Sequence, residues 1–218
     1  DGLQEHYNHV YKILKRREKS AIFFIPSKIL NKNTFLKVHK IHFLIAKIKI
    51  DKLLDQLNNL LKKNRSKNLQ NYSNFNKSYT SNDDHQKVNL FKRYLNYYID
   101  HNSSEKIVSK LIRINKINLE NKNFYLNKKN LLTMSNNKMV IGSHSHSHPV
   151  LSNLNYKNQK HEIFLSSKVL QQVTGKKMNF FSFPYGIKNT YNQFTLRLLT
   201  KIGVKHSFIA DNHISSDK

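Results

Sequence analysis

The 218-residue chain contains no cysteine and no tryptophan, and it has only five glycines and three prolines. Without cysteine there is no disulfide framework to hold the fold, and the redox compartment stays open. The longest apolar run, Ala21 to Pro26, is far shorter than the roughly 20 residues that a membrane-spanning helix needs. No segment resembles a signal peptide, although the first residue is Asp rather than Met. The compartment is therefore left unknown, with the cytoplasm slightly favoured.

Acidic residues are scarce: 13 Asp and Glu stand against 38 Lys and Arg, which gives a formal net charge of +25. Clustered basic residues would indicate a nucleic-acid-binding surface. The lysines, however, are spread through nearly every segment together with abundant Asn and Ile, as a general compositional drift would produce. A basic nucleic-acid-binding protein is therefore the least favoured hypothesis, and no specific nucleic-acid partner is expected.

The apolar content is sufficient for a core, since 38% of the residues are hydrophobic and 13 are Phe. Helical spacing over residues 4–19 is followed by a fully apolar strand over residues 21–25, which is the rhythm of a parallel α/β fold. The region 33–123 instead shows amphipathic helical stripes, interrupted by a polar link near 64–84. We therefore predict an α/β domain formed by 1–32 and 124–218, with a mainly helical insertion at 33–123.

The α/β pattern returns after the insertion. A strand is expected over 138–142, a helix over 157–173 with Gly175 as its stop signal, a strand over 179–183, and a last strand over 204–210. Capping pairs are expected at Asn102 with Glu105 and at Thr190 with Gln193. In parallel sheets chemistry gathers at the carboxyl ends of the strands.

Three histidines follow the strand at 138–142, in the run Gly142-Ser143-His144-Ser145-His146-Ser147-His148-Pro149. Pro149 disfavours a helical conformation for His148, so the run is expected to be a loop rather than one face of a helix. In an extended chain alternate residues share a face, so all three imidazoles can point the same way. Neutral imidazole is a common zinc ligand, and a metal site is favoured over a merely polar loop.

This run, then a helix, then Phe181-Ser182-Phe183-Pro184-Tyr185-Gly186, resembles the second and third motifs of polysaccharide deacetylases, the NodB-homology enzymes of carbohydrate esterase family four. The opening Asp1-Gly2 resembles the tail of that family's first motif, Thr-Phe-Asp-Asp-Gly. The likeness covers roughly residues 1–30 and 125–210. It implies a distorted (β/α) barrel and the hydrolysis of N-acetyl groups on a polysaccharide or sugar precursor by metal-activated water.

The resemblance also implies site residues. Asp1, His144 and His148 correspond to the ligands of a divalent metal, with zinc favoured over other divalent transition metals. Tyr185 would offer its backbone N–H to the developing oxyanion, and Phe183, Pro184 and Tyr185 would bind the sugar. The remaining histidine of the run, at position 146, falls on a variable position of the motif, where it can orient ligands instead.

The chain departs from the family pattern at three places. The family's base precedes the ligand aspartate and so would lie before residue 1. No convincing general-acid histidine motif appears, since His206 and His213 are poor candidates, and Ser182 stands where many members carry arginine. A fragment clipped at both ends is the favoured interpretation, and a noncatalytic carbohydrate-binding relative is the alternative.

Two further groups of titratable residues receive structural rather than functional interpretations. His39 and His42 lie three apart on an expected helix, where a partly buried pair with hydrogen bonds is favoured over a second metal site. Asp83-Asp84-His85 lies in the polar link, where a solvated cluster is expected.

Overall fold

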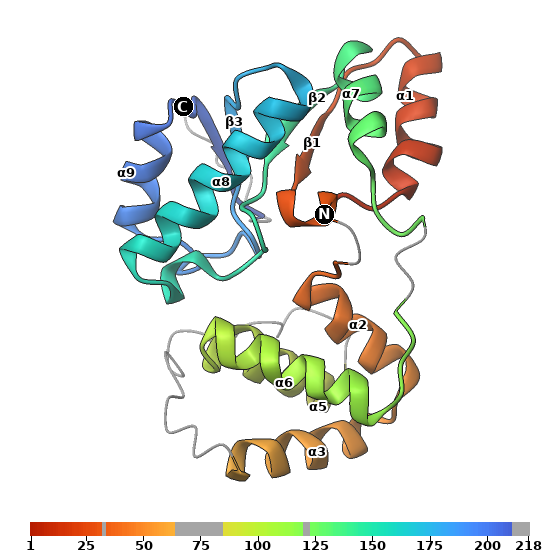
Figure 1. Cartoon of the computed structure of the whole chain (residues 1–218), viewed down its shortest axis with the longest axis vertical. Helices are drawn as coiled ribbons and strands as arrows, with labels where there is room; N and C mark the ends of the chain where they lie inside the picture. The colour runs from red at the N-terminus through yellow and green to blue at the C-terminus, as the bar shows by residue number, and fades with distance from the viewer. Residues whose placement is uncertain (32–33, 64–84, 120–122, 211–218) are drawn as a thin grey trace. The chain divides into compact units, whose positions relative to one another are not determined.

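The computed structural model describes residues 1–31, 34–63, 85–119 and 123–210 (Figure 1). The chain divides into two compact units, which we call unit 1 (Asp1–Thr34 with Glu120–Lys218) and unit 2 (Phe35–Leu119). The assignment of unit 1 as a deacetylase domain and of unit 2 as an insertion stays a prediction.

Unit 1 alternates helices with short strands. Its elements are η1 (His6–Tyr11), α1 (Lys12–Arg16), β1 (Ile22–Ile25), η2 (Ser27–Leu30), α7 (Lys128–Asn136), β2 (Val140–Ser143), η4 (Leu151–Asn153), α8 (Tyr156–Thr174), β3 (Phe180–Ser182), α9 (Gln193–Lys201) and β4 (His206–Phe208). The four strands form one sheet in the order β1-β2-β3-β4, and every neighbouring pair is parallel. Because all four strands run the same way, their carboxyl ends meet at one edge of the sheet.

The core of unit 1 lies between this sheet and its helices. α8 packs along the sheet, where it contacts β2, α7 and α9 (Figure 1). Apolar side chains from β3 and the residue after it, from η4 and from both later helices form one buried cluster: Leu151, Ile163, Phe181, Phe183, Leu198 and Leu199. The last strand, β4, is exposed along its length.

Gly142 in β2 is required by close packing rather than by its backbone conformation. A Cβ at this position would lie 2.6 Å from two ring carbons of Phe24, the residue paired with it on β1. A glycine therefore leaves room for the Phe24 ring beside the strand that leads into the histidine run.

The helix starts differ from the sequence predictions. The N-cap of α9 is Asn192 and not Thr190: the Oδ1 of Asn192 accepts the N–H of Thr195, and the backbone N–H of Asn192 donates to the Oγ1 of Thr195. The prediction for the helix in unit 2 was wrong in the same way, since Asp100 caps it by accepting the N–H of Ser103. Asn is a better capping residue than Thr, which accounts for Asn192, whereas Asp100 and Asn102 are equally good caps and the fold selects between them.

Unit 2 is wholly helical in its described part. Its elements are α2 (Lys37–Lys47), α3 (Ile50–Lys63), α5 (Gln86–Arg93), the π-helical turn η3 (Tyr94–Tyr98) and α6 (His101–Ile114). The apolar stripes of these helices meet in one core, composed of Ile41, Leu44, Leu53, Leu57, Phe91, Leu95, Ile99, Ile107, Val108 and Leu111. None of the described helices in either unit is long and apolar enough to span a bilayer.

Candidate functional site

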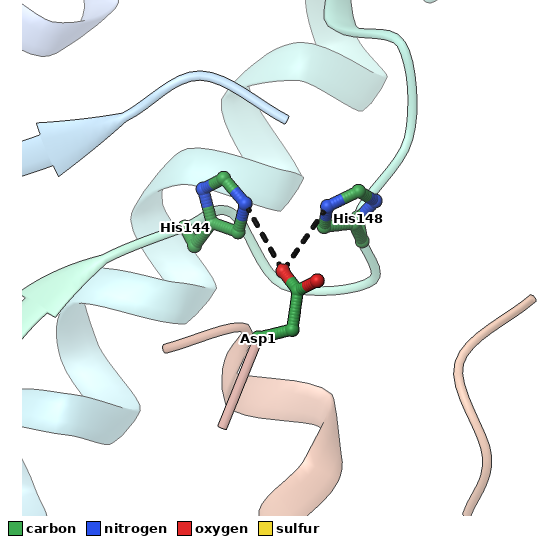
Figure 2. A group of neighbouring side chains, drawn as sticks. All are labelled: Asp1, His144 and His148. Carbon is green, nitrogen blue, oxygen red and sulfur yellow. Dashed lines mark ion pairs between the residues drawn. The ribbon is translucent and has the colours of Figure 1, made fainter. Parts of the chain in front are cut away.

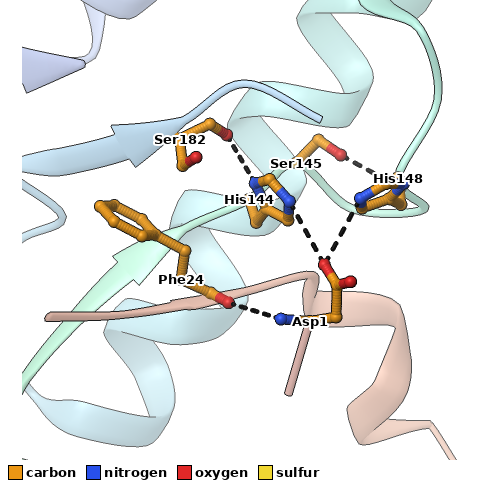
Figure 3. A network of polar contacts seen from close by, with 6 residues as sticks. All are labelled: Asp1, Phe24, His144, Ser145, His148 and Ser182. Atoms are coloured by element: carbon orange, nitrogen blue, oxygen red, sulfur yellow. Dashed lines mark hydrogen bonds and ion pairs between the residues drawn. The ribbon is translucent and has the colours of Figure 1, made fainter. Parts of the chain in front are cut away.

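The histidine run forms a loop at the carboxyl end of β2, as the sequence predicted. The N–H of His144 still donates to the carbonyl of Ile25, so the first histidine continues the pairing with β1. At the chain start, the main-chain nitrogen of Asp1 donates to the carbonyl of Phe24 at 3.4 Å, which brings Asp1 to the same edge of the sheet (Figure 3).

The backbone of the loop turns sharply between the two outer histidines. Ser145 and His148 both have φ of 62°, in the left-handed region that residues other than glycine rarely adopt. The Oγ of Ser145 accepts the N–H of His148 at 3.1 Å and so closes the turn (Figure 3). Uncommon backbone conformations of this kind cost free energy and concentrate at functional sites.

The turn directs the two outer imidazoles at the carboxylate of Asp1 (Figure 2). The Nε2 atoms of His144 and His148 each lie 3.4 Å from the Oδ1 of Asp1. The histidines are 9% and 6% exposed, whereas the Asp1 side chain is 37% exposed. Within the described part of the chain, this is the one group of three or more His, Asp, Glu or Cys side chains spaced to hold a metal ion.

The protonation of His144 is set by the next strand. Its Nδ1 lies 2.7 Å from the backbone carbonyl oxygen of Ser182, which can only accept, so Nδ1 carries the proton and donates (Figure 3). Burial is the main cause that lowers the pKa of His144 to about 4, and the bond to the Ser182 carbonyl opposes the shift. At neutral pH the Nε2 of His144 is therefore an unprotonated lone pair that faces a carboxylate oxygen.

Two such acceptors repel one another unless a cation lies between them. Zinc bonds to imidazole nitrogen and carboxylate oxygen are about 2.0–2.2 Å long, and at a tetrahedral angle they place neighbouring ligand atoms about 3.3–3.6 Å apart. Both contacts of Asp1 Oδ1 with the imidazoles fall in this range. The donor set therefore fits a small divalent cation.

The segment after β3 lies beside the same group. Tyr185 has φ of 64°, is half-buried, and its ring contacts the ring of His148 with centroids 4.9 Å apart. Phe183 is 2% exposed, belongs to the core of unit 1 and stacks on Tyr191, and Pro184 is buried. The structure thus shows a packing role for Phe183, while contacts of this segment with a sugar stay a prediction.

His146, the middle histidine, is not part of the candidate metal group. Its Nδ1 lies 2.8 Å from the Oγ of Ser27 at the start of η2. Burial lowers the pKa of His146, the carboxylate of Glu162 opposes this, and Lys28 and His161 add to the lowering. The three imidazoles therefore do not share one face, and the expectation that alternation aligns them was wrong because the loop is not extended.

Sequence reasoning missed two groups that hold the loop. One is the carbonyl of Ser182, which any residue type would supply, so the sequence carries no signal for it. The other is Glu162 of α8, which accepts hydrogen bonds from His146 and Ser147. The sequence did carry a signal for Glu162: an acidic residue next to Ile163 and one helical turn before Ser166 lies on the buried face of the helix, where Glu is rare.

The remaining described candidates are not members of this group. His39 and His42 contact one another with ring centroids 6.3 Å apart, and His39 is buried. His206 is exposed and stacks on Phe180. His85 caps α5, where its Nδ1 accepts the N–H of Lys87. The other predicted residues of these groups, Asp83, Asp84 and His213, lie outside the described residues.

Comparisons with known proteins agree on one family. A profile of the polysaccharide deacetylase family matches residues 1–207. A search of curated proteins found no match to this chain.

Three solved structures share the fold at low sequence identity. The deacetylase PplD of Streptococcus pyogenes, solved in complex with acetate, gives a TM-score of 0.50 at 13% identity, over 94% of this chain and 50% of that one. The deacetylase domain of BpsB from Bordetella bronchiseptica gives 0.52 at 13%, over 95% and 60%. A de-N-acetylase from Aggregatibacter actinomycetemcomitans gives 0.51 at 16%, over 96% and 60%.

This chain thus spans 50% to 60% of the length of these three structures. With the parallel sheet, the matches confirm the predicted α/β fold of the NodB-homology type.

Proposed function

Because the chain belongs to the polysaccharide deacetylase family, we propose that the protein of which it forms part is a metal-dependent hydrolase that removes N-acetyl groups from a glycan or sugar precursor. One observation carries the proposal: the Oδ1 of Asp1 lies 3.4 Å from the Nε2 atoms of both His144 and His148. The bond from the Nδ1 of His144 to the Ser182 carbonyl leaves its Nε2 as an acceptor. A group of acceptors this close is stabilised by a cation.

Asp1, His144 and His148 are the residues that would hold the metal. A divalent ion held by one carboxylate and two imidazoles polarises a carbonyl oxygen and lowers the pKa of water. Zinc is the proposed ion, since it accepts mixed nitrogen and oxygen ligands in tetrahedral geometry and leaves a fourth position open in catalytic sites.

The chain's own residues would prepare this site in three ways. The carbonyl of Ser182 fixes the His144 ring so that its lone pair faces Asp1. Burial keeps the imidazole neutral, so no proton competes for that lone pair. The backbone N–H of Tyr185, beside His148, would donate to the oxygen that becomes negative as water adds to the amide.

Removal of an acetyl group from an amide also needs a base to take the proton from water and an acid to protonate the departing amine. We assign neither role to a residue of this chain. The proposed contribution of the chain is therefore ligation of the metal, stabilisation of the oxyanion and, through Tyr185 and Pro184, contact with the sugar.

Acetate release tests the proposal. The natural full-length protein, loaded with Zn²⁺, should release acetate from N-acetylated hexosamine oligomers, and His148→Ala should reduce the rate by 100-fold or more. Since losing one oxyanion donor alone costs about 100- to 1,000-fold, loss of a metal ligand should cost at least as much. Oligomer binding without acetate release by the Zn²⁺-loaded wild type would contradict the hydrolase and favour a noncatalytic carbohydrate-binding protein.

A further inference from the structure

We propose that Glu162 is a positioning residue that holds the histidine loop, residues 144–148, in the shape that directs two imidazoles at Asp1. The proposal rests on the proposed metal site and deepens it. It assigns a role to the one buried acidic side chain that contacts the loop from α8.

Glu162 accepts three hydrogen bonds from two consecutive loop residues. Its Oε2 accepts the N–H of His146 at 2.9 Å and the N–H of Ser147 at 2.7 Å, and its Oε1 accepts the hydroxyl of Ser147 at 2.7 Å. The residue is 7% exposed. Hydrogen bonds to an ionised acceptor are roughly twice as strong as neutral ones, so this contact is a strong local restraint.

The loop needs such a restraint because its backbone is unfavourable without one. Ser145 and His148, the residues on either side of the pair that Glu162 contacts, both have left-handed φ. The N–H groups of His146 and Ser147, between these two residues, require acceptors, and both donate to Glu162. By accepting both N–H groups, the Glu162 carboxylate offsets the free-energy cost of the turn that places the imidazoles of His144 and His148 on the same side.

The opposite side of the loop is held by η2. The N–H of Ser27 donates to the carbonyl of Ser145 at 3.2 Å, and the N–H of Lys28 donates to the carbonyl of His146 at 3.0 Å. The loop is therefore fixed between a 3₁₀ turn and α8, and Glu162 is its side-chain contact from α8.

Burial of the Glu162 carboxylate would not stabilise the protein by packing alone. The neighbouring positions on the buried face of α8 are occupied by Gln159, Ile163, Ser166 and Leu170, which are apolar or uncharged. A carboxylate on such a face loses its hydration, and it is tolerated only when it is fully hydrogen-bonded. A leucine would fill the space without this cost, so we attribute the carboxylate to the two N–H groups that it orders.

Two substitutions separate positioning from packing. In Glu162→Gln the amide oxygen can accept both N–H groups while the amide NH₂ donates to the Ser147 hydroxyl, so all three contacts survive without the charge. In Glu162→Ala all three are lost. Residues that orient ligands typically contribute about 10- to 100-fold in metal affinity. We expect Glu162→Ala to weaken Co²⁺ binding by about this factor and Glu162→Gln to stay within about threefold of the wild type.

The measurement is Co²⁺ titration of the full chain, followed by visible absorption at a temperature where each variant is folded. Thr174→Ala is the matched control, because Thr174 lies in the same helix, is buried, and donates to the carbonyl of Leu170 far from the loop. It should lower stability without changing the Co²⁺ affinity or the d–d band shape. Equal affinity in wild type and Glu162→Ala, or equal loss in Glu162→Ala and Thr174→Ala, would overturn the proposal.

Hydrogen exchange of the loop amides keeps the two proposals distinguishable. A wild type that binds no Co²⁺ would contradict the proposed metal site. In that case hydrogen exchange at the amides of His146 and Ser147 would still test the role of Glu162. Protection of these amides should fall in Glu162→Ala and persist in Glu162→Gln and Thr174→Ala. Unchanged protection in Glu162→Ala would refute the role of Glu162 independently of the metal.

Discussion

His144 and His148 differ from His146 in what their ring nitrogens face, although all three stand in one run of the sequence. The outer two face Asp1, while the Nδ1 of His146 is bonded to Ser27. The motif resemblance separated these roles and alternation alone did not, because period-two reasoning assumes an extended chain and the loop contains two left-handed residues.

This difference gives a matched pair of substitutions. His148→Ala should weaken Zn²⁺ binding by 100-fold or more, because one of three ligands is removed. His146→Ala should change the affinity by less than about tenfold, which is below the 10- to 100-fold effect of residues that orient ligands. Calorimetric titration of both variants checks this, and a larger loss for His146→Ala than for His148→Ala would show that the wrong histidines have been assigned.

Lys37 in unit 2 provides a residue-scale test that is independent of the metal. It is 2% exposed, its Nζ donates to the carbonyl of Leu95 at 2.8 Å, and burial lowers its pKa to about 8, against the opposing charges of Glu105 and Asp100. Between pH 8 and pH 10.5 the unfolded chain holds this proton more tightly than the folded chain does. Stability contributed by this group therefore rises with pH across that window.

Lys37→Met should therefore stabilise the protein at pH 7, where the charged amine is buried at a cost of about 3 kcal/mol. The carbonyl of Leu95 keeps a second donor, the hydroxyl of Ser104, so the substitution leaves it bonded. The stabilisation by Lys37→Met, measured as the free energy of unfolding in urea, should shrink between pH 8 and pH 10. The exposed Lys52→Met is the control, and a gain that grows with pH would contradict the assignment.

Among the elements, the strands and most helices could be predicted, because apolar runs and helical stripes report burial directly. The helix at 157–173 and its stop at Gly175 agree with α8, whose C-cap glycine has φ of 69°. The caps at Thr190 and Asn102 were wrong, since several capping residues compete within one turn and only the fold selects among them. The π-helical turn Tyr94–Tyr98 has no local sequence signature and was not predicted.

Substitutions at two glycines separate the effect of close packing at β2 from the effect of backbone conformation. Gly142→Ala should cost about 1–3 kcal/mol, because its Cβ would lie 2.6 Å from the Phe24 ring and the ring must move. Gly175→Ala has open space around its Cβ but φ of 69°, so it should cost about 1–2 kcal/mol through backbone strain alone.

Urea unfolding gives both values. Metal affinity distinguishes them further: it should fall in Gly142→Ala, because β2 leads directly into the histidine loop, and it should be unchanged in Gly175→Ala. Equal affinities in the two variants would mean that the packing of Phe24 against β2 does not position the loop.

At the scale of the whole molecule, the candidate site depends on residues far apart in the chain. Asp1 comes from the start of the sequence and the histidines from its middle, and the parallel sheet brings them together at one edge. No periodicity within a short window predicts such a meeting. The family resemblance supplied it, while Glu162 and the carbonyl of Ser182 became apparent only from the fold.

Metal binding should also be visible as stability of the whole chain. A ligand that binds only the folded state at a free concentration of 100 Kd stabilises it by about 2.7 kcal/mol. Zn²⁺ should therefore raise the melting temperature of the wild type, and a chelator should reverse the shift. In the double variant His144→Ala, His148→Ala the same Zn²⁺ concentration should have no effect, and an equal shift there would point to binding at other histidines.

The most direct test of the site is the location of the ion itself. Crystals of the Zn²⁺-loaded chain, measured at the zinc absorption edge, should give an anomalous peak about 2.0–2.2 Å from Asp1 Oδ1 and from the Nε2 atoms of His144 and His148. A strong peak bound to other side chains, with none between these three atoms, would contradict the metal site and the hydrolase proposed from it.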